Sequence, residues 1–151
     1  FDLLSGDRST SPDRDEGFNP LYGTHHKFYG YMDYFYVGNP HKNKGLVDAF
    51  LKARFKISGK SFLLTHAHQF MTQSRISNES KEDLSSALGT EIDLVYVLNI
   101  APGVILNVGY SRLIHTESME FVKDVPDPKN ASWAWVMIGF KSVLFTAKTE
   151  N

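Results

Sequence analysis

Apolar and polar residues alternate along several stretches of the chain, most clearly over 45–58, which reads GLVDAFLKARFKIS. One set of alternate positions, from Val47 to Ile57, is apolar, and the other, from Asp48 to Lys56, is mostly charged. A period of two places these sets on opposite faces of a β-strand, whereas a helix would scatter the apolar set around its circumference. The pattern therefore predicts a long strand with one apolar and one charged face.

The same alternation recurs over 61–71, 88–100, 104–113 and 133–145, and residues 1–6 read as the end of one more strand. Residues 71–87 are polar and loop-like, with at most a helical turn expected within 80–89. We find no pattern that predicts a long helix. The expected fold class is all-β, an antiparallel up-and-down meander of about six long strands.

Long and short connections alternate between these strands. Short turns at 58–60 and 101–103 alternate with long polar connections at about 6–44, 72–88 and 114–132. In an antiparallel meander, alternate connections lie at opposite ends, so we expect long loops at one end and tight turns at the other. That asymmetry, with strands of about 10–13 residues, is typical of outer-membrane barrels. A soluble barrel with its apolar face inward gives the same alternation, so both interpretations stay open.

Composition narrows the class of protein. The chain has 151 residues, a formal net charge of −1 and no cysteine. Its length suits a single domain over 1–151. The lack of cysteine excludes a disulfide scaffold and cysteine-ligated metal sites, and the near-neutral charge argues against a nucleic-acid partner. The chain opens without an initiator Met or a leader peptide, so we expect a mature or truncated sequence.

Charged residues on the non-apolar strand faces are the first candidates for a functional site. If these faces line a pore, fixed positive charge lowers the barrier for an anionic solute. The candidate pore-lining cations are Lys52, Arg54, Lys56, Lys141 and Arg112. The other polar residues expected in the lumen are Asp48, Glu91, Asp93, His66 and His68. Alternatively, the cations are ordinary polar lumen residues balanced by the acidic ones.

The sequence gives little support to a metal site or an enzyme. His66 and His68 share one strand face, and two His at that spacing can share a metal. No carboxylate accompanies them at a fixed spacing, so we expect no metal and no cofactor. The chain also lacks HExxH, GxSxG and P-loop motifs. Glu91 and Asp93 on one strand face read as a lumen pair, so no catalytic residue is expected.

An aromatic block over 22–39, YGTHHKFYGYMDYFYVGN, lies in the longest connection, just before the clearest strand. Its aromatic side chains, among them Tyr31, Tyr34 and Phe35, either stack on sugar rings or pack a compact loop onto the barrel. Packing is the preferred interpretation. We read the block as a structured external loop.

This block, in the form FNPLYGTHHKFYGYMDYFYVGN followed by GLVDAFLKA, resembles the alginate-export family of outer-membrane β-barrels. The resemblance continues through LGTEIDL, VGYSRLIHTESME and WAWVMIGFK. It implies that the chain is the C-terminal portion of a larger transmembrane barrel in the bacterial outer membrane. It also implies a porin-like, passive passage of an anionic solute or polysaccharide, with membrane lipid and the N-terminal remainder of the barrel as partners. The alternative is a soluble antiparallel β-barrel that binds a small apolar ligand.

Overall fold

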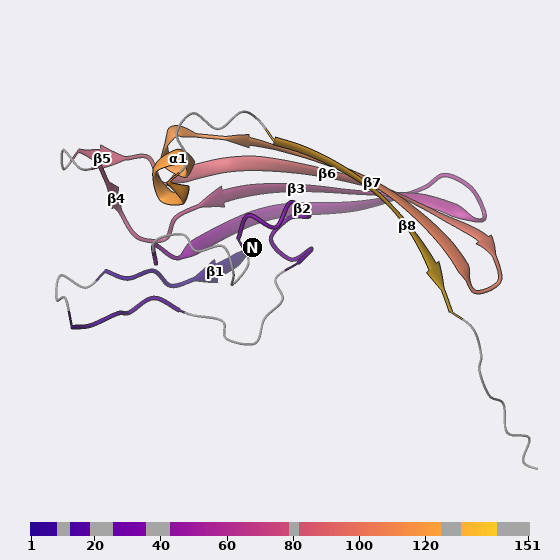
Figure 1. The fold of residues 1–151 in the computed structure, drawn as a ribbon, viewed down its shortest axis with the longest axis horizontal. Helices are drawn as coiled ribbons and strands as arrows, with labels where there is room; N and C mark the ends of the chain where they lie inside the picture. Colours follow the sequence, from indigo (N-terminus) through magenta and orange to yellow (C-terminus); the bar gives the residue numbers. More distant parts are fainter. Residues whose placement is uncertain (9–12, 19–25, 36–42, 79–81, 125–130, 142–151) are drawn as a thin grey trace, which may run out of the picture.

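One antiparallel sheet of six strands dominates the fold (Figure 1). The computed structural model describes residues 1–8, 13–18, 26–35, 43–78, 82–124 and 131–141. The strands lie in the order β1-β2-β3-β6-β7-β8, and β4 and β5 form a separate hairpin. The sheet consists of β1 (Asp2–Leu4), β2 (Leu46–Lys56), β3 (Ser61–Met71), β6 (Ala87–Ala101), β7 (Val104–His115) and β8 (Ala131–Phe140); the hairpin consists of β4 (Ile76–Ser77) and β5 (Asp83–Leu84).

The predicted antiparallel meander is confirmed, because every neighbouring pair in the sheet is antiparallel and follows chain order. Five of the strands contain 10 to 15 residues, whereas β1 contains three. About six long strands were expected, and five of the observed strands are long. Among the described residues the sheet is open, with β1 and β8 as its edges. The last strand was predicted over 133–145; β8 starts and ends earlier, and residues 142–145 lie outside the described part of the chain.

Tight turns lie at one end of the sheet and long connections at the other, as the sequence predicts (Figure 1). At the turn end, the N–H groups of Ile57 and Ser58 donate to the carbonyl of Ser61 over 3.0 and 3.1 Å. The β6–β7 turn passes through Gly103 with φ of 74°, a conformation that glycine adopts without a steric penalty. The two ends are therefore built differently, from short hydrogen-bonded turns and from long segments that fold over the sheet.

A short helix, α1 (Glu117–Lys123), lies at the loop end, where the sequence predicts only a polar connection. Met119 and Val122 are buried on its inner side, and the hydroxyl of Thr116 donates to the carbonyl of Ala87 over 2.6 Å. Two turns of helix are too few to give a clear period in the sequence. The helical turn expected within 80–89 is wrong, since β5 and the start of β6 occupy the described part of that segment. No helix of the described residues is long and apolar enough to span a membrane.

The main hydrophobic core lies at the loop end, where α1 and residues 29–35 pack on the sheet. The rings of Phe35 and Phe70 are 4.5 Å apart in this core. Its buried residues are Tyr29, Phe35, Leu46, Phe70, Ile76, Leu88, Leu113, Met119 and Val122. A smaller cluster of Tyr31, Val95 and Val97 continues toward the middle of the sheet. The long connections are thus held on the sheet by burial of apolar side chains.

The two faces of the sheet differ in character. The face that carries Leu51 and Val136, here the apolar face, presents apolar side chains to the outside: Leu51 is 72% exposed, Val136 69% and Phe140 78%. The opposite face, here the polar face, carries the alternate residues of each strand, including Asp48 and Lys52. The core described above lies over its loop end. The sheet therefore leaves its apolar face uncovered by described residues, while long connections cover part of its polar face.

Candidate functional site

Five ionisable side chains from three neighbouring strands lie together on the polar face; we call them the polar cluster. They are Asp48 from β2, His66 and His68 from β3, and Glu91 and Asp93 from β6. The strand register pairs His66 with Asp93 and His68 with Glu91. All but the half-buried His66 are at most 1% exposed. Burying an ionisable group costs free energy unless the group is paired, so the partners of each side chain decide how the cluster is stabilised.

His68 lies between two carboxylates. Its Nδ1 is 2.8 Å from Asp48 Oδ2, and its Nε2 is 4.0 Å from Asp93 Oδ2. A carboxylate oxygen accepts a hydrogen bond from an imidazole N–H, so this contact fits the tautomer in which Nδ1–H donates to Asp48. The other nitrogen, Nε2, then faces Asp93. The His68 ring also stacks on Phe70, with ring centroids 5.5 Å apart, which fixes its orientation.

Residues 29–35, here the covering segment, close the cluster from above. Glu91 Oε1 accepts a hydrogen bond from the N–H of Met32 at 3.0 Å. Gly30 has φ of 79°, and a Cβ atom there would lie 2.4 Å from Glu91 Oε1. Only glycine combines that conformation with so close an approach to the carboxylate. The local sequence thus lets the backbone of the loop rest directly on Glu91.

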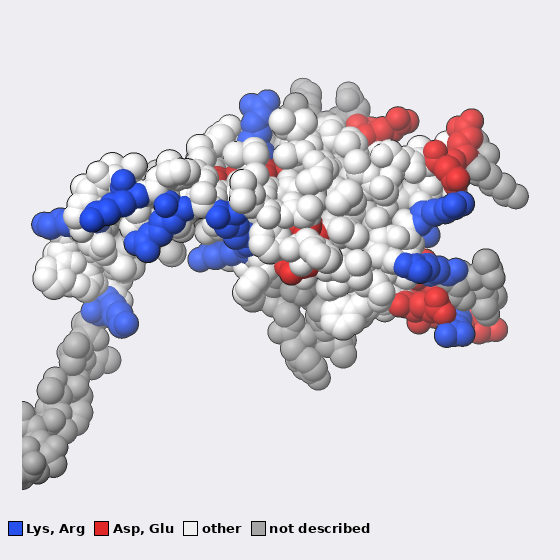
Figure 2. All heavy atoms as spheres, turned by 180° about the vertical axis from the view of Figure 1, so that it is seen from behind, with Lys and Arg blue, Asp and Glu red and all other residues white. Residues whose placement is uncertain are grey.

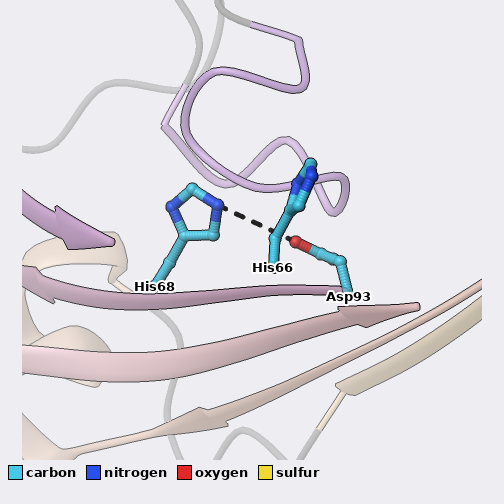
Figure 3. Close-up of side chains that lie close together, drawn as sticks. All are labelled: His66, His68 and Asp93. Atoms are coloured by element: carbon cyan, nitrogen blue, oxygen red, sulfur yellow. Dashed lines mark ion pairs between the residues drawn. The ribbon is translucent and has the colours of Figure 1, made fainter. Parts of the chain in front are cut away.

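The cluster keeps unused hydrogen-bonding capacity. Several of its buried atoms have no hydrogen-bond partner among the described residues: Asp48 Oδ1, His66 Nδ1, His68 Nε2, Glu91 Oε2 and both carboxylate oxygens of Asp93. Figure 3 shows His66 and His68 rising from β3 and Asp93 from β6, all on the side of the covering segment. Buried polar atoms are nearly always bonded to protein or to a bound species. A cation or ordered water is therefore the expected occupant.

The aromatic residues of the covering segment pack on the sheet. Tyr31 is 6% exposed and Phe35 3%, and burial raises the pKa of Tyr31. The Tyr31 ring stacks on Trp135, with centroids 6.0 Å apart, and lies 5.7 Å from the His66 ring. Trp135 itself fits across β7 because a Cβ atom at Gly109 would lie 2.2 Å from its indole. These placements support packing rather than sugar stacking for Tyr31 and Phe35.

Lys123 of α1 joins the helix to the covering segment. Its Nζ donates to the carbonyl of Tyr34 over 2.5 Å and lies 5.0 Å from the centre of the Phe35 ring. Tyr34 is half-buried. Burial lowers the pKa of Lys123 to about 8, because the charged ammonium loses hydration there. The charge of Lys123 is therefore held at some cost in a partly apolar setting.

Basic side chains follow the polar face from the edge of the polar cluster, where Lys52 lies opposite His66, toward the turn end. Lys52, Arg54 and Lys56 on β2, here the basic row, are all exposed. The Arg54 guanidinium lies 3.8 Å from the centre of the Phe62 ring, a cation–π contact that orients it. Lys141 directly follows β8, and its N–H donates to the carbonyl of Gly103 in the β6–β7 turn. Figure 2 shows a group of Lys and Arg over the turn end of the molecule, whereas Asp and Glu lie toward the other end together with further Lys and Arg.

Arg112 does not belong with these cations. The register places it opposite Ile92 on one side and Ser132 on the other, on the apolar face. Arg112 was predicted to line the pore because it lies near an external strand end. The structure corrects that grouping: Arg112 and Lys52 point to opposite sides of the sheet.

One relationship could not be read from the sequence, the position of Asp93 beside the two histidines. The sequence places His66 and His68 on one strand face and Glu91 and Asp93 on another strand's face, but 15 residues, 72–86, separate β3 from β6. A long connection does not fix the register between two strands, whereas a two-residue turn does.

Searches against protein-family models, curated proteins and solved structures found no match to this chain.

Proposed function

We propose that this chain is the C-terminal portion of an outer-membrane β-barrel and contributes to a porin-like channel for an anionic solute or polysaccharide. The single observation that carries the proposal is the polarity of the sheet. Its apolar face is exposed, with seven Leu, Ile, Val and Phe side chains at least half exposed: Leu3, Leu51, Phe55, Ile114, Val136, Ile138 and Phe140. At about 1.5–3 kcal/mol per large apolar side chain transferred from water, their burial in lipid is worth on the order of 10 kcal/mol.

Strand length supports the same proposal. An 11-residue strand such as β2 spans roughly 36 Å at about 3.3 Å per residue. Tilted by about 40°, it crosses roughly 28 Å, slightly more than the 25 Å apolar band of an outer-membrane barrel. Most of the long strands of the sheet reach or exceed this length.

The open edges support a larger assembly. A sheet edge in lipid leaves backbone N–H and C=O groups without partners, at several kcal/mol each. Barrels of this kind have at least eight strands, and the described residues of this chain form a sheet of six. The proposal therefore includes further strands from the remainder of the barrel, which pair with β1 and β8, and membrane lipid around the apolar face.

The polar face would then line the lumen. The basic row gives it a run of exposed positive charge at the turn end, and a fixed positive charge lowers the electrostatic barrier for an anion. No nucleophile, base or cofactor enters this function, so the proposed role is transport without catalysis.

The alternative, a soluble barrel that binds a small apolar ligand, requires Leu51 and Phe55 in a packed core. Both are more than half exposed on a face that no described residue covers. That exposure favours the membrane proposal over the soluble one.

Single-cysteine variants can test the proposal without background, because the chain contains no natural cysteine. We would label Leu51→Cys and Phe55→Cys with an environment-sensitive fluorophore, assemble each labelled chain with the remainder of the barrel in vesicles, and quench with lipids that carry nitroxides on their acyl chains. Lys52→Cys and Arg54→Cys are the matched controls, one residue away on the opposite face. We expect quenching at the first pair and none at the second.

Equal quenching at all four positions, or none, would contradict a lipid-facing apolar side. A chain that stays monodisperse in buffer without detergent would also overturn the proposal, because an uncovered apolar face of this size requires detergent or lipid. If that monodisperse form were a dimer with Leu51 and Phe55 at its interface, self-association would take the place of the membrane.

A further inference from the structure

We propose that His66, His68 and Asp93 bind one divalent transition-metal ion of the zinc class. The inference rests on the polar cluster alone and is independent of the proposed transport function. It departs from the sequence-based expectation of no metal, which rested on the lack of a carboxylate at a fixed spacing from the two histidines.

The three side chains converge on one point. One ligand atom from each lies within 4.8 Å of the other two, and His68 Nε2 is 4.0 Å from Asp93 Oδ2 (Figure 3). Ligand atoms around tetrahedral zinc are about 3.4 Å apart, since the Zn–N and Zn–O distances are about 2.0–2.2 Å. Movements of about 1 Å at the side-chain ends would close the difference. The strand register supplies the convergence, because His66 faces Asp93 directly and His68 lies two residues further along the same face.

The candidate ligand atoms are free to bind. His66 Nδ1, His68 Nε2 and both oxygens of Asp93 are buried and have no hydrogen-bond partner in the described part of the chain. His68 and Asp93 are each 1% exposed. Leaving such atoms buried without partners costs about 1–3 kcal/mol each, and more for charged groups. A bound cation would satisfy all three side chains together.

Asp48 has the position of an outer-shell partner. Its Oδ2 lies 2.8 Å from His68 Nδ1, so the proton sits on the nitrogen that faces away from the proposed ion. Metal-binding histidines usually make this bond to a carboxylate, which fixes the ring and makes the other nitrogen a better ligand. A buried His that contacts a carboxylate through Nδ1 and points Nε2 toward Asp93 has the arrangement expected of a metal ligand.

The charge balance also favours a cation. Two carboxylates flank His68, those of Asp48 and Asp93; both are buried, and within the described residues His68 makes the ion pair to each of them. A divalent ion would offset most of that negative charge. Two nitrogen ligands and one oxygen ligand suit zinc and its first-row neighbours, whereas Ca²⁺ and Mg²⁺ prefer oxygen ligands only. Three protein ligands leave one coordination position for water.

Titration of the metal-free chain with Zn²⁺, followed by calorimetry, tests the inference, with Co²⁺ as a spectroscopic probe. We expect one equivalent of Zn²⁺ per chain, and a Co²⁺ absorption spectrum of the intense kind given by tetrahedral sites. His66→Asn and Asp93→Asn should each weaken Zn²⁺ binding by at least tenfold, and Asp48→Asn by about 10- to 100-fold. His115→Asn is the matched control: His115 is also partly buried, contacts Glu120 at 3.6 Å and should bind as the natural chain does.

Circular dichroism shows whether each variant keeps its sheet. The Co²⁺ spectrum of the unmodified chain needs no variant, so a folding defect cannot hide a negative result. A natural chain that binds no Zn²⁺, or gives only the weak octahedral Co²⁺ spectrum, would overturn the inference. So would Zn²⁺ binding that both His66→Asn and Asp93→Asn leave unchanged, or Ca²⁺ binding as tight as Zn²⁺ binding. None of these results affects the lipid-quenching test of the transport proposal.

Discussion

Gly30 is the residue on which the closure of the polar cluster depends most directly. Its φ of 79° costs an alanine about 1–2 kcal/mol, and the new Cβ would lie 2.4 Å from Glu91 Oε1. That contact is too short to persist, so the carboxylate would move away from the N–H of Met32, to which it is bonded at 3.0 Å. Breaking that bond leaves a buried group without its partner, which costs about 1–3 kcal/mol. Gly30→Ala should therefore destabilise the closed covering segment by about 3 kcal/mol.

Hydrogen–deuterium exchange followed by mass spectrometry measures this opening locally. A change of about 3 kcal/mol, at about 1.4 kcal/mol per factor of ten, should raise exchange in peptides over 29–35 on the order of 100-fold. Peptides from the middle of β3 and β6 should keep their protection, because the ladder between those strands does not involve Gly30. The predicted effect is thus confined to the covering segment.

Gly59 provides the matched control. A Cβ atom at Gly59, in the β2–β3 turn, would meet nothing within 4 Å, so Gly59→Ala should leave exchange over 29–35 unchanged. If Gly30→Ala also left that exchange unchanged, or raised exchange equally throughout the sheet, the contact with Glu91 would not be what holds the segment in place.

Two further predictions concern charge. The pKa of Lys123 is lowered to about 8 from an ordinary value of 10.5, so the folded chain binds its proton less tightly than the unfolded chain does, and stability should rise between about pH 8 and 10.5. Lys123→Met should lack this rise. The difference in thermal unfolding midpoint between the natural chain and the variant should therefore increase from pH 7 to pH 10. A difference that does not change with pH would contradict a buried ammonium. In bilayers that contain the complete barrel, Lys52→Glu with Arg54→Glu should shift the reversal potential in a salt gradient toward cation selectivity. Arg75→Glu, at an exposed loop position, is the control, and an equal shift in both would remove the basic row from the solute path.

The sequence predicts the strands of the sheet well because one physical rule governs them. A strand with two different faces alternates with period two, and this rule found β2, β3, β6, β7 and β8 and assigned Leu51 and Lys52 to opposite faces. The rule does not identify structure that forms over only a few residues, because such a segment is too short to show a period. In α1 the buried residues are only Ser118, Met119 and Val122. Arg112 was grouped with the pore-lining cations from its place near a strand end, although the alternation of β7 puts it with Tyr110 on the apolar face.

The candidate site was harder to predict than the fold because it depends on contacts between segments far apart in sequence. His66 and Asp93 were each identified as polar residues of one sheet face, but their pairing follows from a register that 15 intervening residues leave undetermined. The covering segment presents the same difficulty. The sequence shows an aromatic block with a glycine in it, and nothing in the block indicates that Gly30 lies against Glu91, more than 60 positions further on.

The two proposals bear on each other through the order of charges along the polar face. Asp48 and Asp93 lie toward the loop end and the basic row toward the turn end, so an anion that follows this face meets both signs of charge. Uncompensated carboxylates in a low-dielectric wall would repel such a solute, because charges in that setting are weakly screened. Two features counter that repulsion. The covering segment keeps the carboxylates from the open surface. A divalent ion at His66, His68 and Asp93 would cancel most of their charge. Removal of the metal should then reduce anion passage without altering the insertion of the apolar face in lipid, so that parallel measurements of conductance and lipid quenching separate the two roles.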